Sequence, residues 1–294
     1  VEWRGEAHNV VAAEADAFEG VDIAIFSAGE GAALALAPEA VKRGCVCIDN
    51  STAFRKDPVA PLVVPEVNAD ALAGHAGIIA NPNCSTIQML VALKPLHEAY
   101  GIERVVVSTY QAVSGSGQAA VDELLQQTRA FAAGEPLPVN VYPHQIAFNC
   151  LPHIDSFTEN GYTKEEMKMI DETHKILDPN IRITTTTVRM PAVSGHSESI
   201  NVELARDFDV DEVRALFEQA PGIVVQDEPE KNVYPMAITA TGQDPTYVGR
   251  IRRDFSHERA LNFWCVSDNL RKGAALNTVQ IAGELIARDL VRVP

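Results

Sequence analysis

The sequence predicts an α/β protein with two domains, the first built on a parallel sheet and the second of α+β type. In roughly the first 80 residues, short apolar runs alternate with helical patterns, which is the order of a parallel sheet with crossover helices. Farther along, longer β-branched runs follow one another, which is typical of a partly antiparallel sheet. A chain of 294 residues is also long enough for roughly two domains.

The first domain is predicted from strands that end in small or polar residues. Residues 1–11 have the pattern of a strand or hairpin. The alternating elements that follow are a strand at 21–26, a helix at 32–43, strands at 45–48 and 77–80, and a helix at 87–100. Gly44 is a plausible cap for the first of these helices. Because ligands bind at the carboxyl ends of parallel strands, the segments after these strands are candidate binding segments.

The second domain is predicted from β-branched runs, charged helices and one long loop. The expected elements are a strand at 105–113, a helix at 119–133, an irregular loop at 134–152, a helix at 164–177, strands at 181–189 and 199–204, a helix at 208–219, strands near Ile223, Ala237 and Tyr247, a strand at 262–268 and a closing helix at 274–290.

The charge balance excludes some partners. The chain has 24 Lys and Arg against 40 Asp and Glu, a formal net charge of −16. Nucleic acids and anionic membranes are bound by clustered basic residues, so neither is expected as a partner. No apolar run reaches the ~18–20 residues of a membrane span, and no secretory leader is expected. We expect a cytoplasmic enzyme.

The five cysteines do not indicate a disulfide framework or a metal site. Their number is odd, and they are spread over the whole chain. Cys45 and Cys47 are too close for the usual C-x-x-C spacing and lie in an apolar run, where cysteine behaves as a small hydrophobe. We expect no structural disulfide and no metal.

Cys84 is the strongest candidate for a reactive residue. It lies between a predicted buried strand and a helix, where first-turn N–H groups and the helix dipole stabilise a thiolate. Asn83 adds a polar side chain at this turn. The alternative is an inert apolar cysteine, which is the commoner fate of this residue type.

Two other candidates lie seven residues apart. His196 has the chemistry of a base that activates a cysteine, and Arg189 has the guanidinium fork that suits a carboxylate. From spacing alone, a surface histidine remains the simpler interpretation of His196.

Several charged or glycine-containing segments also suit anions. Glu165 and Lys168 are three residues apart and share a helix face, although a solvated charge pair is the usual outcome of this spacing. Arg55 follows a strand and either binds an anion or faces solvent. The turn at 114–117, Ser-Gly-Ser-Gly, precedes a helix and suits a phosphate, but alone it is weak evidence.

These fragments come together through a family resemblance. The chain strongly resembles the aspartate-semialdehyde dehydrogenases over essentially its whole length and in order. The matching stretches are Ser27-Ala-Gly29, Asp49-Asn-Ser-Thr-Ala-Phe-Arg55, Val64-Pro-Glu-Val-Asn68, Asn81-Pro-Asn-Cys-Ser-Thr86, Gln111-Ala-Val-Ser-Gly115, Glu165-Glu-Met-Lys168, Arg189 to His196, and Asn269-Leu-Arg-Lys-Gly-Ala-Ala275. The combination of Asn-Cys-Ser-Thr with Arg-x6-His in one chain is highly specific.

The resemblance implies a Rossmann-like NADP-binding domain, an α+β catalytic and dimerisation domain, and a homodimer. The implied reaction interconverts L-aspartate 4-semialdehyde plus phosphate and 4-phospho-L-aspartate, in the biosynthesis of lysine, methionine and threonine. Cys84 would form a hemithioacetal and then a thioester, His196 would be the general acid/base, and Gln111 would hold the intermediate.

The resemblance also implies binding roles. Arg189 would take the substrate carboxylate and Glu165 its amino group. Phosphate would be bound by Arg55, Lys168 and Asn83. The residues implied to contact NADP are Ser27, Ala28, Gly29, Ser114, Gly115 and Asn269.

One departure from the family pattern lies at the amino terminus. The family opens with a strand, a glycine-rich G-x-x-G-x-x-G turn and a helix, and none of these is present in the sequence. We therefore expect the chain to begin about two elements into an incomplete dinucleotide-binding domain. The expected domains are residues 1–83 with 275–294 for the dinucleotide, and 84–274 for catalysis and dimerisation.

Two alternatives remain open. The N-acetyl-glutamyl-phosphate reductases are the nearest relatives, but they favour Gly before the cysteine and an aromatic residue after it, where this chain has Asn83 and Ser85. A catalytically inactive paralogue that serves as a binding subunit is the second alternative. Cys84, Gln111 and His196 are all present, which argues against it.

Overall fold

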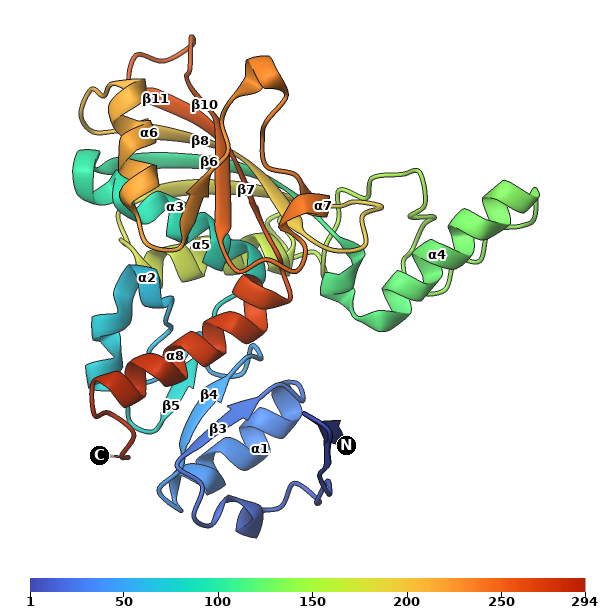
Figure 1. Ribbon diagram of the computed structural model, residues 1–294, viewed down its shortest axis with the longest axis vertical. Coiled ribbons are helices and arrows are strands. Elements are labelled where there is room, and N and C mark those ends of the chain that lie inside the picture. Colours follow the sequence, from blue (N-terminus) through green and yellow to red (C-terminus); the bar gives the residue numbers. More distant parts are fainter. Residues whose placement is uncertain (294) are drawn as a thin grey trace. The chain divides into compact units, whose positions relative to one another are not determined.

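The computed structural model describes residues 1–293, which form two compact units (Figure 1). The first unit contains residues 1–65 and 69–81 together with the described residues from Thr278 onward. The second contains residues 66–68 and 82–277.

The first unit is built on a three-stranded parallel sheet, as the sequence predicts. Its strands are β3 (Ile23–Phe26), β4 (Val46–Asp49) and β5 (Ile78–Ala80), in that order across the sheet. Helix α1 (Glu30–Val41) connects the first two strands and buries a stripe of alanines against the sheet. Strands β1 (Glu2–Trp3) and β2 (Glu6–Ala7) form a separate antiparallel hairpin, so the prediction for residues 1–11 is confirmed.

All four residues of the central strand β4 are buried, and alternate residues point to opposite sides of the sheet. Cys47 faces α1, and its Sγ lies 3.6 Å from the carbonyl oxygen of Ala37. Val46 and Ile48 face the other way, into a cluster with Ile281 and Leu285 of helix α8 (Leu276–Ala287). The closing helix therefore contributes to the core of the first unit, although it is far away in sequence.

The second unit contains a six-stranded mixed sheet. In spatial order its strands are β7 (Arg182–Arg189), β6 (Ile102–Gln111), β8 (His196–Leu204), β11 (Ala260–Ser267), β10 (Thr246–Arg253) and β9 (Ile223–Val225). The outer pairs β6–β7 and β9–β10 are parallel, and the three inner pairs are antiparallel. The predicted α+β character is confirmed.

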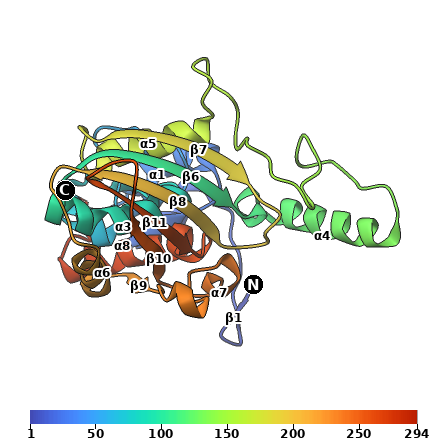
Figure 2. The ribbon, with the colours of Figure 1, turned by 90° about the horizontal axis from the view of Figure 1, so that it is seen from above.

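A layer of helices packs on this sheet. It consists of α3 (Cys84–Tyr100), α5 (Lys164–Ile176) and α6 (Val210–Gln219). Helix α3 is apolar on almost every side and lies buried across the central strands, so its first residue is fixed at the edge of the core. Helix α4 (Gln118–Ala133) instead projects away from the sheet together with the loop that follows it (Figure 2).

One predicted strand is wrong. The segment near Ala237 forms a short helix, α7 (Ala237–Ala240), and not a strand. The sheet position next to β10 is already occupied by β9, so a strand there would have no partner. The hydroxyls of Thr239 and Thr241 donate to the carbonyls of Met236 and Ala237, which stabilises the helical turn. Two further short elements are α2 (Pro65–Asn68) and a π-helical turn at Arg271–Ala275.

Candidate active site

Cys84 is the first residue of α3, and Asn83 is its N-cap. The Asn83 side-chain oxygen accepts the backbone N–H groups of Ser85 (3.0 Å) and Thr86 (3.2 Å). This cap fixes the first turn of the helix, where the positive end of the helix dipole favours a thiolate. Cys84 is only partly buried, whereas Cys45, Cys47 and Cys265 are fully buried. Burial raises the pKa of Cys47 to about 12, so that thiol is unreactive.

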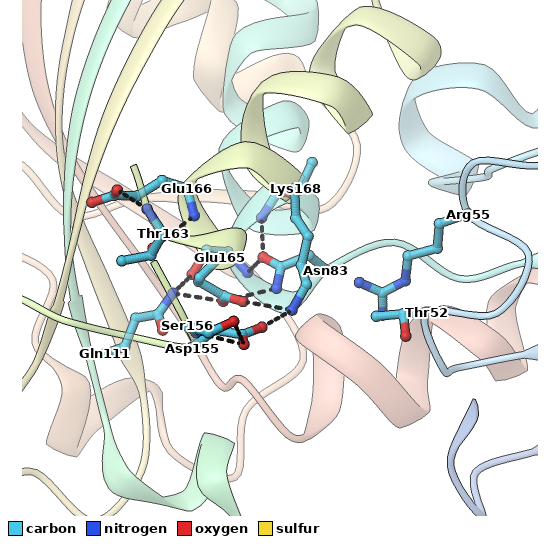
Figure 3. A network of polar contacts seen from close by, with 12 residues as sticks. Thr52, Arg55, Asn83, Gln111, Asp155, Ser156, Thr163, Glu165, Glu166 and Lys168 are labelled. Atoms are coloured by element: carbon cyan, nitrogen blue, oxygen red, sulfur yellow. Dashed lines mark hydrogen bonds and ion pairs between the residues drawn. The ribbon is translucent and has the colours of Figure 1, made fainter. Parts of the chain in front are cut away.

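The Asn83 cap is tied to α5 by a buried polar network (Figure 3). Its amide nitrogen donates to Glu165 Oε1 at 2.9 Å, and Gln111 Nε2 donates to the same oxygen at 3.3 Å. Gln111 also donates to the hydroxyl of Ser85. The sequence-predicted residues Asn83, Gln111 and Glu165 are therefore brought together from a helix start, a strand end and a second helix.

Lys168 completes this network on α5. Its Nζ lies 3.2 Å from Glu165 Oε2 and 2.9 Å from Asp155 Oδ2, so the predicted pairing of Glu165 with Lys168 across one helix turn is present. Burial opposes the charge of Lys168, but the two carboxylates outweigh it and raise the pKa of the ammonium. Lys168 is thus a fixed cation that already has two anionic partners.

A second cluster is organised by the peptide of Ala112, directly after β6. Its carbonyl accepts a hydrogen bond from Arg189 Nη1 at 2.7 Å, and its N–H donates to His196 Nδ1 at 3.1 Å. A Cβ built on Gly115 would lie 3.1 Å from Arg189 Nη1 and 3.2 Å from His196 Nε2. Arg189 and His196 therefore converge on the backbone of Gly115, and His196 is not the surface histidine of the simpler interpretation.

His196 is neutral in this environment. Burial, and then the nearby charge of Arg189, lower the pKa of the imidazole well below its ordinary value. Because Nδ1 accepts the N–H of Ala112, the ring proton resides on Nε2. Within residues 1–293, Nε2 has no hydrogen-bond partner. The ring thus presents a free N–H donor.

The predicted dinucleotide contacts of this unit lie beside the same cluster. Asn269 Oδ1 accepts the N–H of Gly195 at 2.9 Å, and its Nδ2 donates to Ser114 Oγ at 3.0 Å. The N–H groups of Ser114 and Gly115 are engaged by the carbonyls of Val193 and Ala112, so they do not form the open phosphate cradle that the Ser-Gly-Ser-Gly turn suggests.

Four of the predicted binding residues belong to the first unit. Ser27, Ala28 and Gly29 follow β3, and Gly29 has a φ of 91° and begins α1 without a side-chain cap. A Cβ at Gly29 would meet nothing within 4 Å. The N-terminus of α1 is therefore open to an anion such as a dinucleotide phosphate. Arg55 lies in the segment after β4, where its Nη2 donates to the carbonyl of Asn50 at 3.1 Å.

Sequence reasoning missed two residues of the second-unit site. Glu172 accepts the backbone N–H of Asn83 at 2.7 Å, and Asp155 pairs with Lys168. Glu172 follows Glu165 by seven residues, which is two helix turns, so a shared helix face was a usable signal. Asp155 lies between the predicted loop at 134–152 and the helix at 164–177, where no periodicity points to it.

Among residues 1–293, no group of three or more His, Cys, Asp or Glu side chains could hold a metal ion. Over the same residues, no helix is long and apolar enough to cross a membrane.

Comparison with known proteins gives the family. Residues 3–75 match the model of the semialdehyde dehydrogenase NAD binding domain, and residues 93–272 match that of the semialdehyde dehydrogenase dimerisation domain. The aspartate-semialdehyde dehydrogenase of Bacillus subtilis is 51% identical over 99% of this chain and 87% of its own length. The enzyme of that name from Aquifex aeolicus is 52% identical over 98% of this chain and 86% of its own length.

The chain belongs to the aspartate-semialdehyde dehydrogenase family. A solved structure agrees with this: aspartate-semialdehyde dehydrogenase II of Vibrio cholerae, crystallised in complex with ASA, is 50% identical. It superimposes with a TM-score of 0.88, covering 90% of this chain and 79% of the other. The two family models fall on different sides of Cys84, which lies in the segment between them.

Proposed function

We propose that the chain catalyses the reversible, NADP-dependent conversion of L-aspartate 4-semialdehyde and phosphate into 4-phospho-L-aspartate, in the biosynthesis of lysine, methionine and threonine. The observation that carries the proposal is Cys84 at the start of α3, beside an Asn83 cap that is bonded to Glu165. Relatives that share about half of the residues carry the name of this activity.

The first step is the attack of Cys84 on the aldehyde. The helix N-terminus favours the thiolate, and the sulfur adds to the aldehyde carbon to give a hemithioacetal. Negative charge develops on the former aldehyde oxygen. The Nε2–H of His196 is the donor that we assign to this oxygen, because Nε2 is free and its proton is held in place by the bond from Ala112 to Nδ1.

His196 is also the residue that we assign to acid–base catalysis. To accept a proton at Nε2, the ring must carry its proton on Nδ1, where the N–H of Ala112 now points. Proton transfer at Nε2 therefore requires this hydrogen bond to open. The low pKa of the buried ring favours return to the neutral form after each transfer.

Substrate recognition uses the two clusters of the second unit. The buried guanidinium of Arg189 has a neutral carbonyl as its partner and is assigned to the substrate carboxylate. Glu165 is assigned to the substrate ammonium, and Gln111 to holding the bound intermediate. Both side chains are buried and fixed by hydrogen bonds, so they are already oriented before the substrate arrives.

The thioester and the acyl phosphate complete the sequence. NADP, when bound, would accept the hydride lost from the hemithioacetal carbon, and the hydroxyl proton would pass to Nε2 of His196. Phosphate then adds to the thioester carbonyl, the C–S bond breaks, and Cys84 leaves as a thiolate. We assign Asn83, Lys168 and Arg55 to the phosphate.

The residues present fit a dinucleotide. In the first unit, the open N-terminus of α1 after Ser27, Ala28 and Gly29 suits a phosphate group. In the second unit, Gly115 leaves space over His196 that a side chain would fill. We assign Ser114, Gly115 and Asn269 to the nicotinamide half of the molecule.

The proposed organisation follows from these assignments. Residues 1–83 with 275–294 form the dinucleotide domain, and residues 84–274 form the catalytic and dimerisation domain. We propose a homodimer, which the match to a dimerisation-domain model supports. Light scattering coupled to size-exclusion chromatography would test this oligomeric state. We place the reaction in the cytoplasm, where the reduced thiol and NADP that it needs are available.

The test is phosphate-dependent reduction of NADP by L-aspartate 4-semialdehyde, followed at the absorbance of NADPH. Wild type should be active, and Cys84→Ser should lose at least about 1,000-fold in kcat, because a hydroxyl is far less nucleophilic than a thiolate at neutral pH. Cys150→Ser is the matched control, since Cys150 is an exposed cysteine of the same unit and should be dispensable.

Other results would contradict the proposal in different ways. Activity on N-acetyl-glutamate 5-semialdehyde, with none on L-aspartate 4-semialdehyde, would favour the related reductase. Slow alkylation of Cys84 together with inactivity on both substrates would favour an inactive binding subunit. Retained activity in Cys84→Ser would exclude the covalent mechanism.

A further inference from the structure

Lys168, which the proposed function assigns to phosphate, is held by two carboxylates of different character. Glu165 lies on the same helix, its side chain is 8% exposed, and it accepts hydrogen bonds from Asn83 and Gln111 as well. Asp155 lies in the loop before α5, its side chain is 35% exposed, and its Oδ2 bonds Lys168 at 2.9 Å. Glu165 thus has three partners in this network, Asn83, Gln111 and Lys168, whereas Asp155 is bonded to Lys168 and, through Oδ1, to the N–H of its neighbour Ser156 at 2.7 Å (Figure 3).

The local charge does not suit a phosphate as it stands. Lys168, Glu165 and Asp155 together carry one positive and two negative charges. A phosphate that approached Lys168 would meet the like charge of Asp155 a few ångströms away, and like charges at that distance repel. Burial opposes the charge of Asp155, but the Lys168 ammonium and the backbone N–H of Ser156 together outweigh it and lower the pKa of that carboxyl, so Asp155 is ionised at neutral pH.

Backbone contacts hold the loop that carries Asp155, independently of the ion pair between Asp155 and Lys168. Asp155 has a φ of 67°, a left-handed conformation that Asp and Asn tolerate better than most residues. Its neighbour Ser156 accepts the N–H of Lys164 at 2.8 Å, and Phe157 forms a β-bridge with Thr163. The loop is thus anchored to the start of the helix that carries Lys168.

We propose that Asp155 is an exchangeable counter-ion: it pairs with the Lys168 ammonium in the free enzyme, and inorganic phosphate displaces Asp155 when the phosphate binds. Asp155 is in this sense a positioning residue, which keeps the Lys168 side chain extended toward the site and sets the affinity for phosphate by competition. The inference rests on the proposed assignment of Lys168 to phosphate.

The test is Asp155→Asn, which removes the charge and keeps both the shape and the tolerance of a left-handed φ. The KM for phosphate should fall about fivefold, equivalent to about 1 kcal/mol, the worth of a partly exposed ion pair. The KM for the semialdehyde should stay within about twofold. A merely structural role for Asp155 would raise one or both constants and would not produce a gain in affinity.

Glu159→Gln is the matched control, since it removes one charge from an exposed position of the same loop. It should leave the phosphate KM unchanged. In a Lys168→Ala background, Asp155→Asn should change the phosphate KM by less than about twofold, because the competition requires the ammonium. Calorimetric titration with inorganic phosphate gives a second measurement that does not depend on turnover, and the Kd should fall by the same factor.

The outcomes separate the two claims. If Lys168→Ala weakens the binding of phosphate, but Asp155→Asn leaves the KM and Kd for phosphate unchanged or higher, the counter-ion role is wrong. The assignment of Lys168 to phosphate then stands. If Lys168→Ala has no effect on phosphate, both are wrong. If turnover is absent but Asp155→Asn tightens phosphate binding, the counter-ion role stands and the proposed reaction fails.

Discussion

Arg189 and Lys168 are held in different ways, and the difference decides what each cation can bind. Arg189 is buried and donates to a neutral carbonyl, so its charge is not compensated there. Lys168 is paired with two carboxylates. The planar guanidinium of Arg189, whose charge is uncompensated, suits a carboxylate held in a fixed orientation. The ammonium of Lys168, which already has partners, suits an anion that exchanges rapidly.

A pair of substitutions tests this division at the residue scale. Arg189→Lys keeps the charge but loses the fork, so the KM for L-aspartate 4-semialdehyde should rise about tenfold while that for phosphate changes less than about twofold. Lys168→Ala should show the opposite pattern. Steady-state kinetics with each substrate varied in turn gives both constants. Equal changes in the same constant for both variants would mean that the two anion sites are assigned wrongly.

At the scale of elements, the nucleophile depends on a turn far away in sequence. The π-helical turn Arg271–Ala275 packs against the start of α3, and a Cβ built on Gly273 would lie 2.9 Å from the Cβ of Cys84 and 3.3 Å from its Cα. The neighbouring Lys272 is buried, and its Nζ donates to Glu66 Oε2 at 2.6 Å and to Asn277 Oδ1 at 2.8 Å. These bonds hold the turn in place against α3. Only glycine allows this contact.

Gly273→Ala should therefore displace Cys84, although alanine is the better helix former by about 1 kcal/mol. We expect kcat/KM to fall at least about tenfold and the alkylation of Cys84 by iodoacetamide to slow by a similar factor. Gly283→Ala in α8 is the control, because nothing lies within 4 Å of its Cβ position. Normal alkylation and turnover in Gly273→Ala would show that the turn does not position the nucleophile.

At the scale of the whole molecule, strand register places buried polar groups behind the site. Glu198 lies two residues after His196 on β8, and the register sets Thr109 of β6 and Cys265 of β11 beside it. The side chains of Glu198, Thr109 and Cys265 are all buried. The amide of Gln88, on α3, favours the charged form of Glu198. Burial outweighs this amide and raises the pKa of Glu198 well above its ordinary value of 4.5.

The folded chain therefore retains a proton on Glu198 that the unfolded chain releases above pH 4.5. Glu198 therefore lowers the free energy of unfolding as the pH rises above 4.5, by up to about 1.4 kcal/mol per pH unit. Glu198→Gln stays neutral, so its free energy of unfolding relative to wild type should increase from pH 5 to pH 8, as urea titrations at each pH would measure.

Other titrating groups do not obscure this comparison. The low pKa of His196 makes stability fall as the pH drops below about 6.5, but this contribution is common to both proteins and cancels in the difference. Burial raises the pKa of Cys265 well above 9, outside the pH range used. Glu159→Gln, at an exposed position, should show a constant difference from wild type. A constant difference for Glu198→Gln would mean that this carboxyl is ionised in the fold.

The sequence by itself determined the elements and their chemistry. Apolar runs that end in polar turns predicted the parallel strands, and the position of Cys84 between a strand and a helix predicted its place at a helix start. The spacing of Glu165 and Lys168 predicted their shared face. These are local properties, set by backbone geometry over a few residues. The predicted strand near Ala237 was wrong, because a strand needs a neighbouring strand to pair with and a local sequence pattern does not show whether one is available.

Only the tertiary structure decided which of these residues meet and in what state. The tautomer of His196 depends on the N–H of Ala112, and its neutrality depends on burial and then on the charge of Arg189. The pairing of Lys168 with Asp155, and the close contact of Gly273 with Cys84, join segments that lie 13 and 189 residues apart. The physical reason is that hydrogen bonds, burial and charge act over a few ångströms of space, whatever the separation along the chain.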